Sequence, residues 1–157
     1  MTQNKWDAHT GIYQEFSFIN VFVEKPDKED VETAVGFLEH HNPAFGCIDV
    51  YDIRYIVENA TNCIVLNGKG LSVKAAIDDA LSHMDSVASD YDISTSQKIL
   101  MFFTVPKSKI PEFIEEWRNC FEEYKRTITD DFAFSSDYCN QGEQIKVMIL
   151  ASGLSEK

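Results

Sequence analysis

The chain has 157 residues, 44% of them hydrophobic, which is enough for one domain with a sizeable core. Its formal net charge of −12 repels phosphate groups and argues against nucleic acid and anionic membranes as partners. No apolar run reaches the length of a membrane span, and the N-terminus lacks a signal-peptide pattern, so we expect a cytoplasmic protein.

The N-terminal part of the chain predicts one strand and two helices. Residues 16–23 are aromatic and β-branched, which is typical of a strand. Asp27 has the position of a helix cap, and the helix that follows ends before Pro43. A short helix is predicted over residues 50–58, after the break at Gly46.

From residue 61 the predicted order is strand, helix, strand, helix, strand, strand. These elements are predicted over residues 63–66, 72–84, 98–105, 110–124, 131–138 and 145–151. Residues 67–70 are predicted as a turn, and the last two strands as an antiparallel hairpin. Each strand–helix–strand step favours a parallel crossover. We therefore expect an α+β fold: a mixed four-stranded sheet with two packed helices, plus an N-terminal strand-helix extension.

The cysteines give no indication of a metal or redox site. They are Cys47, Cys63, Cys120 and Cys139. None forms a C-x-x-C pair, and Cys63 and Cys120 fall in apolar patterns typical of small core residues. His40 and His41 with Cys47 have a spacing that fits no standard zinc site. We expect no metal and no cofactor.

Two carboxylates, Asp49 and Asp52, lie three residues apart where the helix over residues 50–58 begins. There they complement the positive end of the helix dipole and can cap free backbone N–H groups. Two carboxylates at this spacing can also share one face of the first turn and act together. The sequence alone does not decide whether Asp49 and Asp52 cap the helix or have a functional role.

Four segments carry a family resemblance. D-V-Y-D-I-R at residues 49–54 is similar to D-F-A-D-V-[RK], and the strand ending in G-K-G at residues 64–70 precedes an alanine-rich helix. The apolar strand at residues 99–102 and the segment G-E-Q-I-K-V-M-I-L-A-S-G at residues 142–153 follow in order. Together they resemble the C-terminal domain of the tubulin/FtsZ family, whose architecture is similar to that of chorismate mutases.

The resemblance implies two parts: an N-terminal tail with an extra strand over residues 1–30, and the FtsZ C-terminal-like domain over residues 31–157. It also implies that Asp49 and Asp52 occupy positions whose carboxylates act on GTP held by a neighbouring subunit. With Arg54 they are candidate contacts to a partner. The loop departs from the family at Cys47, where the family has asparagine, and at Tyr51, where it has a small residue.

The glycine-rich phosphate loop of the family has no counterpart in this sequence, and Gly68-Lys69-Gly70 lacks the frame of a Walker loop. We therefore expect no catalysis by this chain itself. The leading hypothesis is a non-enzymatic assembly or interaction module that contacts a tubulin/FtsZ-like GTPase or a second copy of itself.

Two other functions stay open. The chain could be a small-molecule-binding protein or an enzyme whose sites lie between the subunits of a chorismate-mutase-like oligomer. The arginines available to hold an anionic substrate are Arg54, Arg118 and Arg126. It could instead be an accessory subunit whose exposed sheet edge, near residues 16–23 or the terminal hairpin, pairs with another chain.

Overall fold

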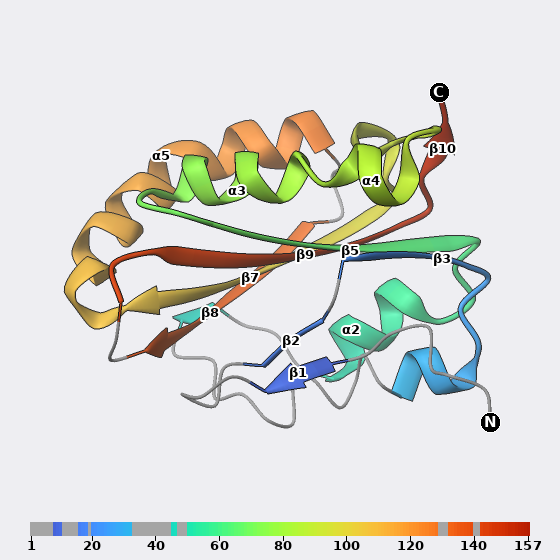
Figure 1. The fold of residues 1–157 in the computed structure, drawn as a ribbon, viewed down its shortest axis with the longest axis horizontal. Coiled ribbons are helices and arrows are strands. Elements are labelled where there is room, and N and C mark those ends of the chain that lie inside the picture. The colour runs from blue at the N-terminus through green and yellow to red at the C-terminus, as the bar shows by residue number, and fades with distance from the viewer. Residues whose placement is uncertain are drawn as a thin grey trace.

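The computed structural model describes residues 8–10, 16–18, 20–32, 45–46, 50–128, 132–139 and 142–157. At its centre lies a six-stranded mixed sheet of order β3-β5-β9-β7-β8-β4 (Figure 1). Its strands are β3 (Val21–Glu24), β4 (Phe45–Gly46), β5 (Asn62–Gly70), β7 (Lys98–Pro106), β8 (Phe132–Cys139) and β9 (Ile145–Ser152). The α+β class expected from the sequence is confirmed.

Helices cover both faces of the sheet, so the fold has three layers (Figure 1). The helices are α2 (Val50–Val57), α3 (Val73–Leu81), α4 (Met84–Ala88) and α5 (Ile110–Ile128). In the view of Figure 1, α3, α4 and α5 lie above the sheet, while α2 and the helical residues 28–32 lie below it. Among the described residues, no helix is both long and apolar enough to cross a membrane.

Short elements complete the described part of the fold. They are β1 (Ala8–Thr10), β2 (Phe16–Phe18), β6 (Tyr91–Asp92), β10 (Ser155–Glu156), η1 (Ile93–Thr95) and η2 (Lys107–Lys109). The strands β1 and β2 pair with each other, and so do β6 and β10. The pairing of β6 with β10 places the C-terminal residues beside the end of α4 (Figure 1).

Four long strands, β5, β9, β7 and β8, form the predicted mixed centre of the sheet. β7 and β8 are parallel and are joined through α5, as the crossover rule predicts. The prediction of a hairpin between β8 and β9 is wrong, because β9 pairs antiparallel with β5 on one side and β7 on the other. Nearly every position of β9 is buried, and a strand that is apolar on both faces is best accommodated inside the sheet.

The predicted strand over residues 16–23 is divided in the structure. Its first part is β2, which pairs with β1, and its last part belongs to β3, which pairs with β5 at the edge of the sheet. At Asn20 the side-chain Oδ1 accepts a hydrogen bond of 2.6 Å from the backbone N–H of Asn67. The Asn20 side chain thus replaces the backbone carbonyl that a longer β3 would offer to Asn67 of β5. One of the two predicted sheet edges is therefore correct, since β3 is outermost, whereas β9 is internal.

Each face of the sheet has its own hydrophobic core. Under α3 and α5, the ring of Phe103 contacts the rings of Phe113 and Trp117 at centroid distances of 5.2 and 5.0 Å. The core under α2 consists of Val23, Val31, Ile56, Val57, Cys63, Val65, Leu100, Phe102, Met148 and Leu150. Val23 and Val31 tie β3 and the helical residues 28–32 to the rest of the domain.

The predicted turn over residues 67–70 is wrong, because β5 continues as a strand to Gly70, which pairs with Ile145. Gly68 and Gly70 allow the strand to pack closely against α3. A Cβ atom at Gly68 would lie 2.3 Å from the backbone oxygen of Ala76, and one at Gly70 would lie 2.6 Å from the Cβ of Ala75. A motif that is typical of a turn is here a packing surface.

Two helices of the described part have side-chain caps, at Asp27 as predicted and at Ser72. The N–H of Asp30 donates to the Asp27 side chain and the N–H of Asp27 donates to the Asp30 side chain, both at 2.9 Å. Ser72 accepts from the third residue of α3. The Glu116 carboxylate of α5 also accepts the first two N–H groups of α3, at 2.8 and 2.9 Å. This long-range cap anchors α3 to α5.

Candidate functional site

The sequence-predicted contact residues lie at and before α2. Asp49 lies outside the described residues. Asp52 lies in the first turn of α2, but its side chain is outside the described part. The structure therefore does not test the capping or contact role of the two carboxylates, which stays a prediction. Arg54 is described.

Arg54 makes ion pairs with two carboxylates. Its Nη1 lies 3.3 Å from Oε1 of Glu32 and 3.8 Å from Oε2 of Glu58. The pair with Glu32 connects α2 to the helical residues 28–32. All three side chains are between 37% and 53% exposed, so each pair contributes at most about 1 kcal/mol. Arg54 is thus held on the surface by two carboxylates and remains partly exposed.

A shallow cavity of about 440 Å³ lies beside Arg54. We define the α2 surface by the residues that line it: Arg54, Tyr55, Glu58, Asn59 and Lys98. Lys98 Nζ donates a 2.8 Å hydrogen bond to the backbone carbonyl of Tyr55 and lies 3.8 Å from the centroid of its ring. Lys98 thus contacts one face of the ring, while the residue Tyr55 remains 56% exposed. An exposed, immobilised tyrosine beside an arginine is typical of a protein contact.

The other predicted cations do not join this surface. Arg118 is exposed on α5, which lies on the opposite face of the sheet (Figure 1). The side chain of Arg126 is outside the described part of the chain. Arg54 and Arg118 are therefore not brought together to hold one anionic substrate.

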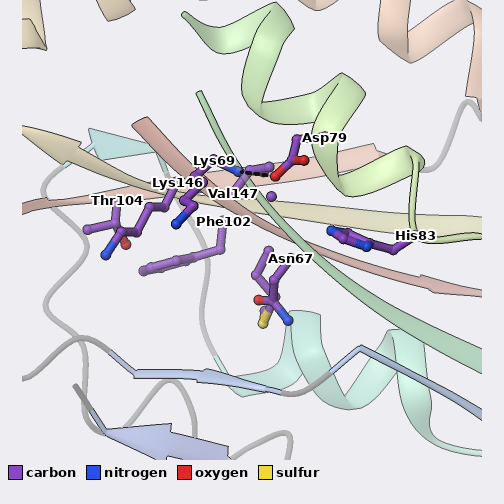
Figure 2. A pocket seen from close by; sticks show the side chains of 10 residues that line it. Asn67, Lys69, Asp79, His83, Phe102, Thr104, Lys146 and Val147 are labelled. Atoms are coloured by element: carbon purple, nitrogen blue, oxygen red, sulfur yellow. Dashed lines mark hydrogen bonds between the residues drawn. The ribbon is translucent and has the colours of Figure 1, made fainter. Parts of the chain in front are cut away.

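The structure contains a second cavity, of about 300 Å³, that sequence reasoning did not find (Figure 2). Its lining comes from β5, β7, β9 and α3: Asn67, Gly68, Lys69, Asp79, His83, Phe102, Thr104, Lys146, Val147 and Met148. Lys146 is a lysine within a predicted strand that is otherwise apolar, but Lys69 falls in residues 67–70, which the sequence predicts as a turn. Their strands are far apart in the chain, so only the pairing of β5 with β9 brings them together.

Cys63 is a core residue, as predicted. Its side chain is fully buried under α2. Burial, with a smaller contribution from the nearby Asp30 carboxylate and against an opposing effect of Lys98, raises the pKa of the Cys63 thiol from 9.0 to about 12. The thiol is therefore protonated and unreactive at neutral pH. In the described residues, no group of three or more His, Cys, Asp or Glu side chains could hold a metal ion.

The raised pKa of Cys63 predicts a loss of stability at alkaline pH. Because the folded-state pKa lies above the unfolded value, the contribution is fully present below pH 9.0 and is lost as pH rises towards 12. The full contribution is about 4 kcal/mol. Urea unfolding at a series of alkaline pH values should show a steeper loss for the natural chain than for Cys63→Ala. Parallel pH profiles for the two proteins would contradict this.

Comparison with solved structures shows that this chain has the fold of a tubulin/FtsZ-like domain. The chain is similar to an FtsZ dimer structure from M. jannaschii, with a TM-score of 0.59 and 17% identity over 79% of this chain and 36% of that one. It is also similar to GDP-form protofilaments of TubZ from Bacillus thuringiensis serovar israelensis, with a TM-score of 0.52 and 15% identity over 82% and 38%.

A helical model of the four-stranded TubZ-Bt filament gives a TM-score of 0.56 at 14% identity, over 82% of this chain and 35% of that one. No family model and no curated protein matches the sequence. At such low identities the likeness shows the fold. The chain spans little more than a third of the length of these proteins, so it has the fold of a partial tubulin/FtsZ-like domain.

Proposed function

We propose that this domain is a non-enzymatic assembly or interaction module that contacts a tubulin/FtsZ-like GTPase or a second copy of itself. The observation that carries the proposal is the fold, which it shares with an FtsZ dimer and with TubZ protofilaments and filaments. Those structures are of a dimer, of protofilaments and of a filament, so each of these proteins associates with copies of itself, and this supports the proposal.

The α2 surface and the segment before it form the proposed contact. Tyr55 supplies exposed aromatic area that is already immobilised by Lys98, which lowers the entropy cost of binding. Arg54 supplies hydrogen-bond donors beside it. In the sequence Asp49 directly precedes α2 and Asp52 falls in its first turn, and by the resemblance to the family both carboxylates would face a nucleotide held by the partner.

The proposal also includes the division of the chain into two parts and the location of the protein in the cell. We place the boundary of the FtsZ-like domain at residue 31, with residues 1–30 as an N-terminal addition that includes β3. We further propose that the protein acts in the cytoplasm.

A small-molecule-binding protein with a chorismate-mutase-like architecture is the second candidate function. The cavity in Figure 2 favours this candidate over an enzyme that depends on arginine.

The test is co-sedimentation with the FtsZ or tubulin-like GTPase of the same organism, together with sedimentation velocity of the domain alone. We expect polymer mass or GTPase rate to change, or the domain to self-associate. Tyr55→Ala should weaken the interaction by about 2 kcal/mol, roughly 30-fold in Kd, as for a central interface tyrosine. Asp49→Ala/Asp52→Ala tests the carboxylate pair in the same assay.

The control is Arg118→Ala, since Arg118 is exposed on the opposite face of the sheet and should leave the interaction unchanged. Two results would overturn the proposal. One is a domain that stays monomeric and has no effect on the GTPase in molar excess. The other is equal weakening by Tyr55→Ala and Arg118→Ala.

A further inference from the structure

The outer edge of β5 is only partly covered by a neighbouring strand. β3 pairs with residues 62–65, and in the described part of the chain no strand pairs with residues 66–70 on that side. The N–H of Lys25 donates to the carbonyl of Thr61 at 2.8 Å. Because hydrogen-bonded pairs alternate along antiparallel strands, the odd-numbered residues of β5 direct their N–H groups to this edge.

Two side chains occupy the uncovered part of the edge in place of a strand. The outward N–H groups there are those of Asn67 and Lys69. The first donates to Oδ1 of Asn20 at 2.6 Å, and the second donates to Oδ2 of Asp79 at 3.0 Å (Figure 2). Both acceptors lie where the backbone carbonyls of a longer β3 would lie. The edge therefore has the hydrogen-bond donors for one more stretch of strand.

The chain has a matching segment directly before β3. Residues 16–23 have one aromatic and β-branched pattern in the sequence, which the structure divides into β2 and β3. If the register of β3 continued, Phe18 would lie opposite Gly68. Phe16 would lie opposite Gly70. An aromatic side chain opposite a strand glycine covers the backbone that the glycine leaves bare, so the two aromatic residues fit the two glycines.

β2 lies close to this edge, although it pairs with another strand. Its residues pair with β1, and β2 lies beside β5 on the α2 side of the sheet (Figure 1). Ser17 is paired with His9 in the structure, and at the register of β3 it would pair with Lys69. Leu71, which follows β5, is 62% exposed, so apolar surface remains uncovered at this end of the edge.

We propose that residues 16–20 form a strap that leaves β1, extends β3 and pairs with residues 66–70 of β5. In this closed state, backbone carbonyls of the strap replace the side chains of Asn20 and Asp79 as acceptors. Closing the strap covers the edge, and opening it exposes a row of backbone groups to which an extended segment of a partner can add. The strap is a conformational switch beyond the assembly role, and it can be observed in the isolated chain.

Two double-cysteine variants of the full chain trap the two states. His9→Cys/Ser17→Cys joins β1 to β2 in the open state, and Ser17→Cys/Lys69→Cys joins the strap to β5 in the closed state. Directly paired residues have Cα atoms about 5.5 Å or less apart, which suits a disulfide. We expect both disulfides to form within one chain under mild oxidation, as identified by mass spectrometry of the digested protein. Ser17→Cys/Arg118→Cys is the control and should give none, because Arg118 is exposed on the opposite face of the sheet.

Amide hydrogen exchange tests the strap without a new covalent bond. Asp79→Ala removes the side chain that accepts from the Lys69 N–H, and the closed strap should keep this amide protected. Adding Phe18→Ser weakens the strap and should then speed the exchange about fivefold. Asp78→Ala, at an exposed position of the same helix, should leave the exchange unchanged.

Three results would overturn the proposal. The first is a disulfide between positions 9 and 17 but none between positions 17 and 69. The second is a disulfide between positions 17 and 69 that forms only between two chains, which would indicate strand exchange instead of a strap. The third is an Lys69 amide that exchanges in Asp79→Ala as fast as in an unstructured peptide.

Discussion

Replacing Gly68 with alanine is expected to destabilise the domain by about 3 kcal/mol or more, the largest effect of any single methyl group that we foresee. The added Cβ would lie 2.3 Å from both the Ala76 backbone oxygen and the Ala80 backbone nitrogen. These atoms belong to the helix backbone, so no side-chain rotation can relieve the clash. β5 and α3 must separate, and the core between them opens.

Urea unfolding followed by circular dichroism measures the effect of Gly68→Ala. Gly142→Ala is the matched control, because a Cβ there meets nothing within 4 Å and only the positive φ of 84° opposes it. That backbone strain costs about 1–2 kcal/mol. Ala80→Gly should not rescue Gly68→Ala, since the clashing atoms remain. Equal losses for Gly68→Ala and Gly142→Ala would show that the close packing of β5 on α3 is not as described.

Replacing Asn62 with aspartate is expected to cost about 3 kcal/mol at neutral pH. Asn62 is buried and holds the C-terminal segment: its Oδ1 accepts from the Leu154 N–H at 2.8 Å, and its Nδ2 donates to the Leu154 carbonyl at 2.9 Å. In Asn62→Asp, a charged oxygen would face that carbonyl. The loss should be accompanied by easier proteolysis after residue 152.

The pH dependence of Asn62→Asp distinguishes this mechanism from simple loss of packing. Burial and the Leu154 carbonyl raise the pKa of the new carboxyl above its unfolded value of about 3.9. Its protonated form can donate to the carbonyl again. The penalty is therefore full at high pH and shrinks as pH falls through the raised folded-state pKa. Asn119→Asp adds the same charge at an exposed site of α5 and should show almost no penalty. A pH-independent loss in Asn62→Asp would rule the mechanism out.

Most of the local structure could be predicted from the sequence, because periodicity and caps are properties of short segments. The stripe of α5 and the buried run of β7 follow from the spacing of their apolar residues. The caps at Asp27 and Ser72 follow from side chains that reach backbone N–H groups only a few residues away. The resemblance to the tubulin/FtsZ fold depended on the same short segments.

The functional surfaces were harder to predict, because their residues come from distant parts of the chain. Arg54 was a candidate contact, but its pairing with Glu32 depends on how α2 packs beside the helical residues 28–32. Tyr55 was not a candidate, because nothing in the sequence indicates that Lys98, 43 residues later, holds its ring. The roles of Asp49 and Asp52 remain predictions.

The sequence by itself determined the α+β class, the order of the main elements and the resemblance to one domain of the tubulin/FtsZ type. Only the tertiary structure decided that β9 lies between β5 and β7, and hence that Lys69 and Lys146 are paired. The physical reason is that strand order follows from burying both faces of an apolar strand, which is a property of the whole sheet. A hairpin of β8 and β9 satisfies the local pattern equally well, but it would leave β9 with an exposed edge.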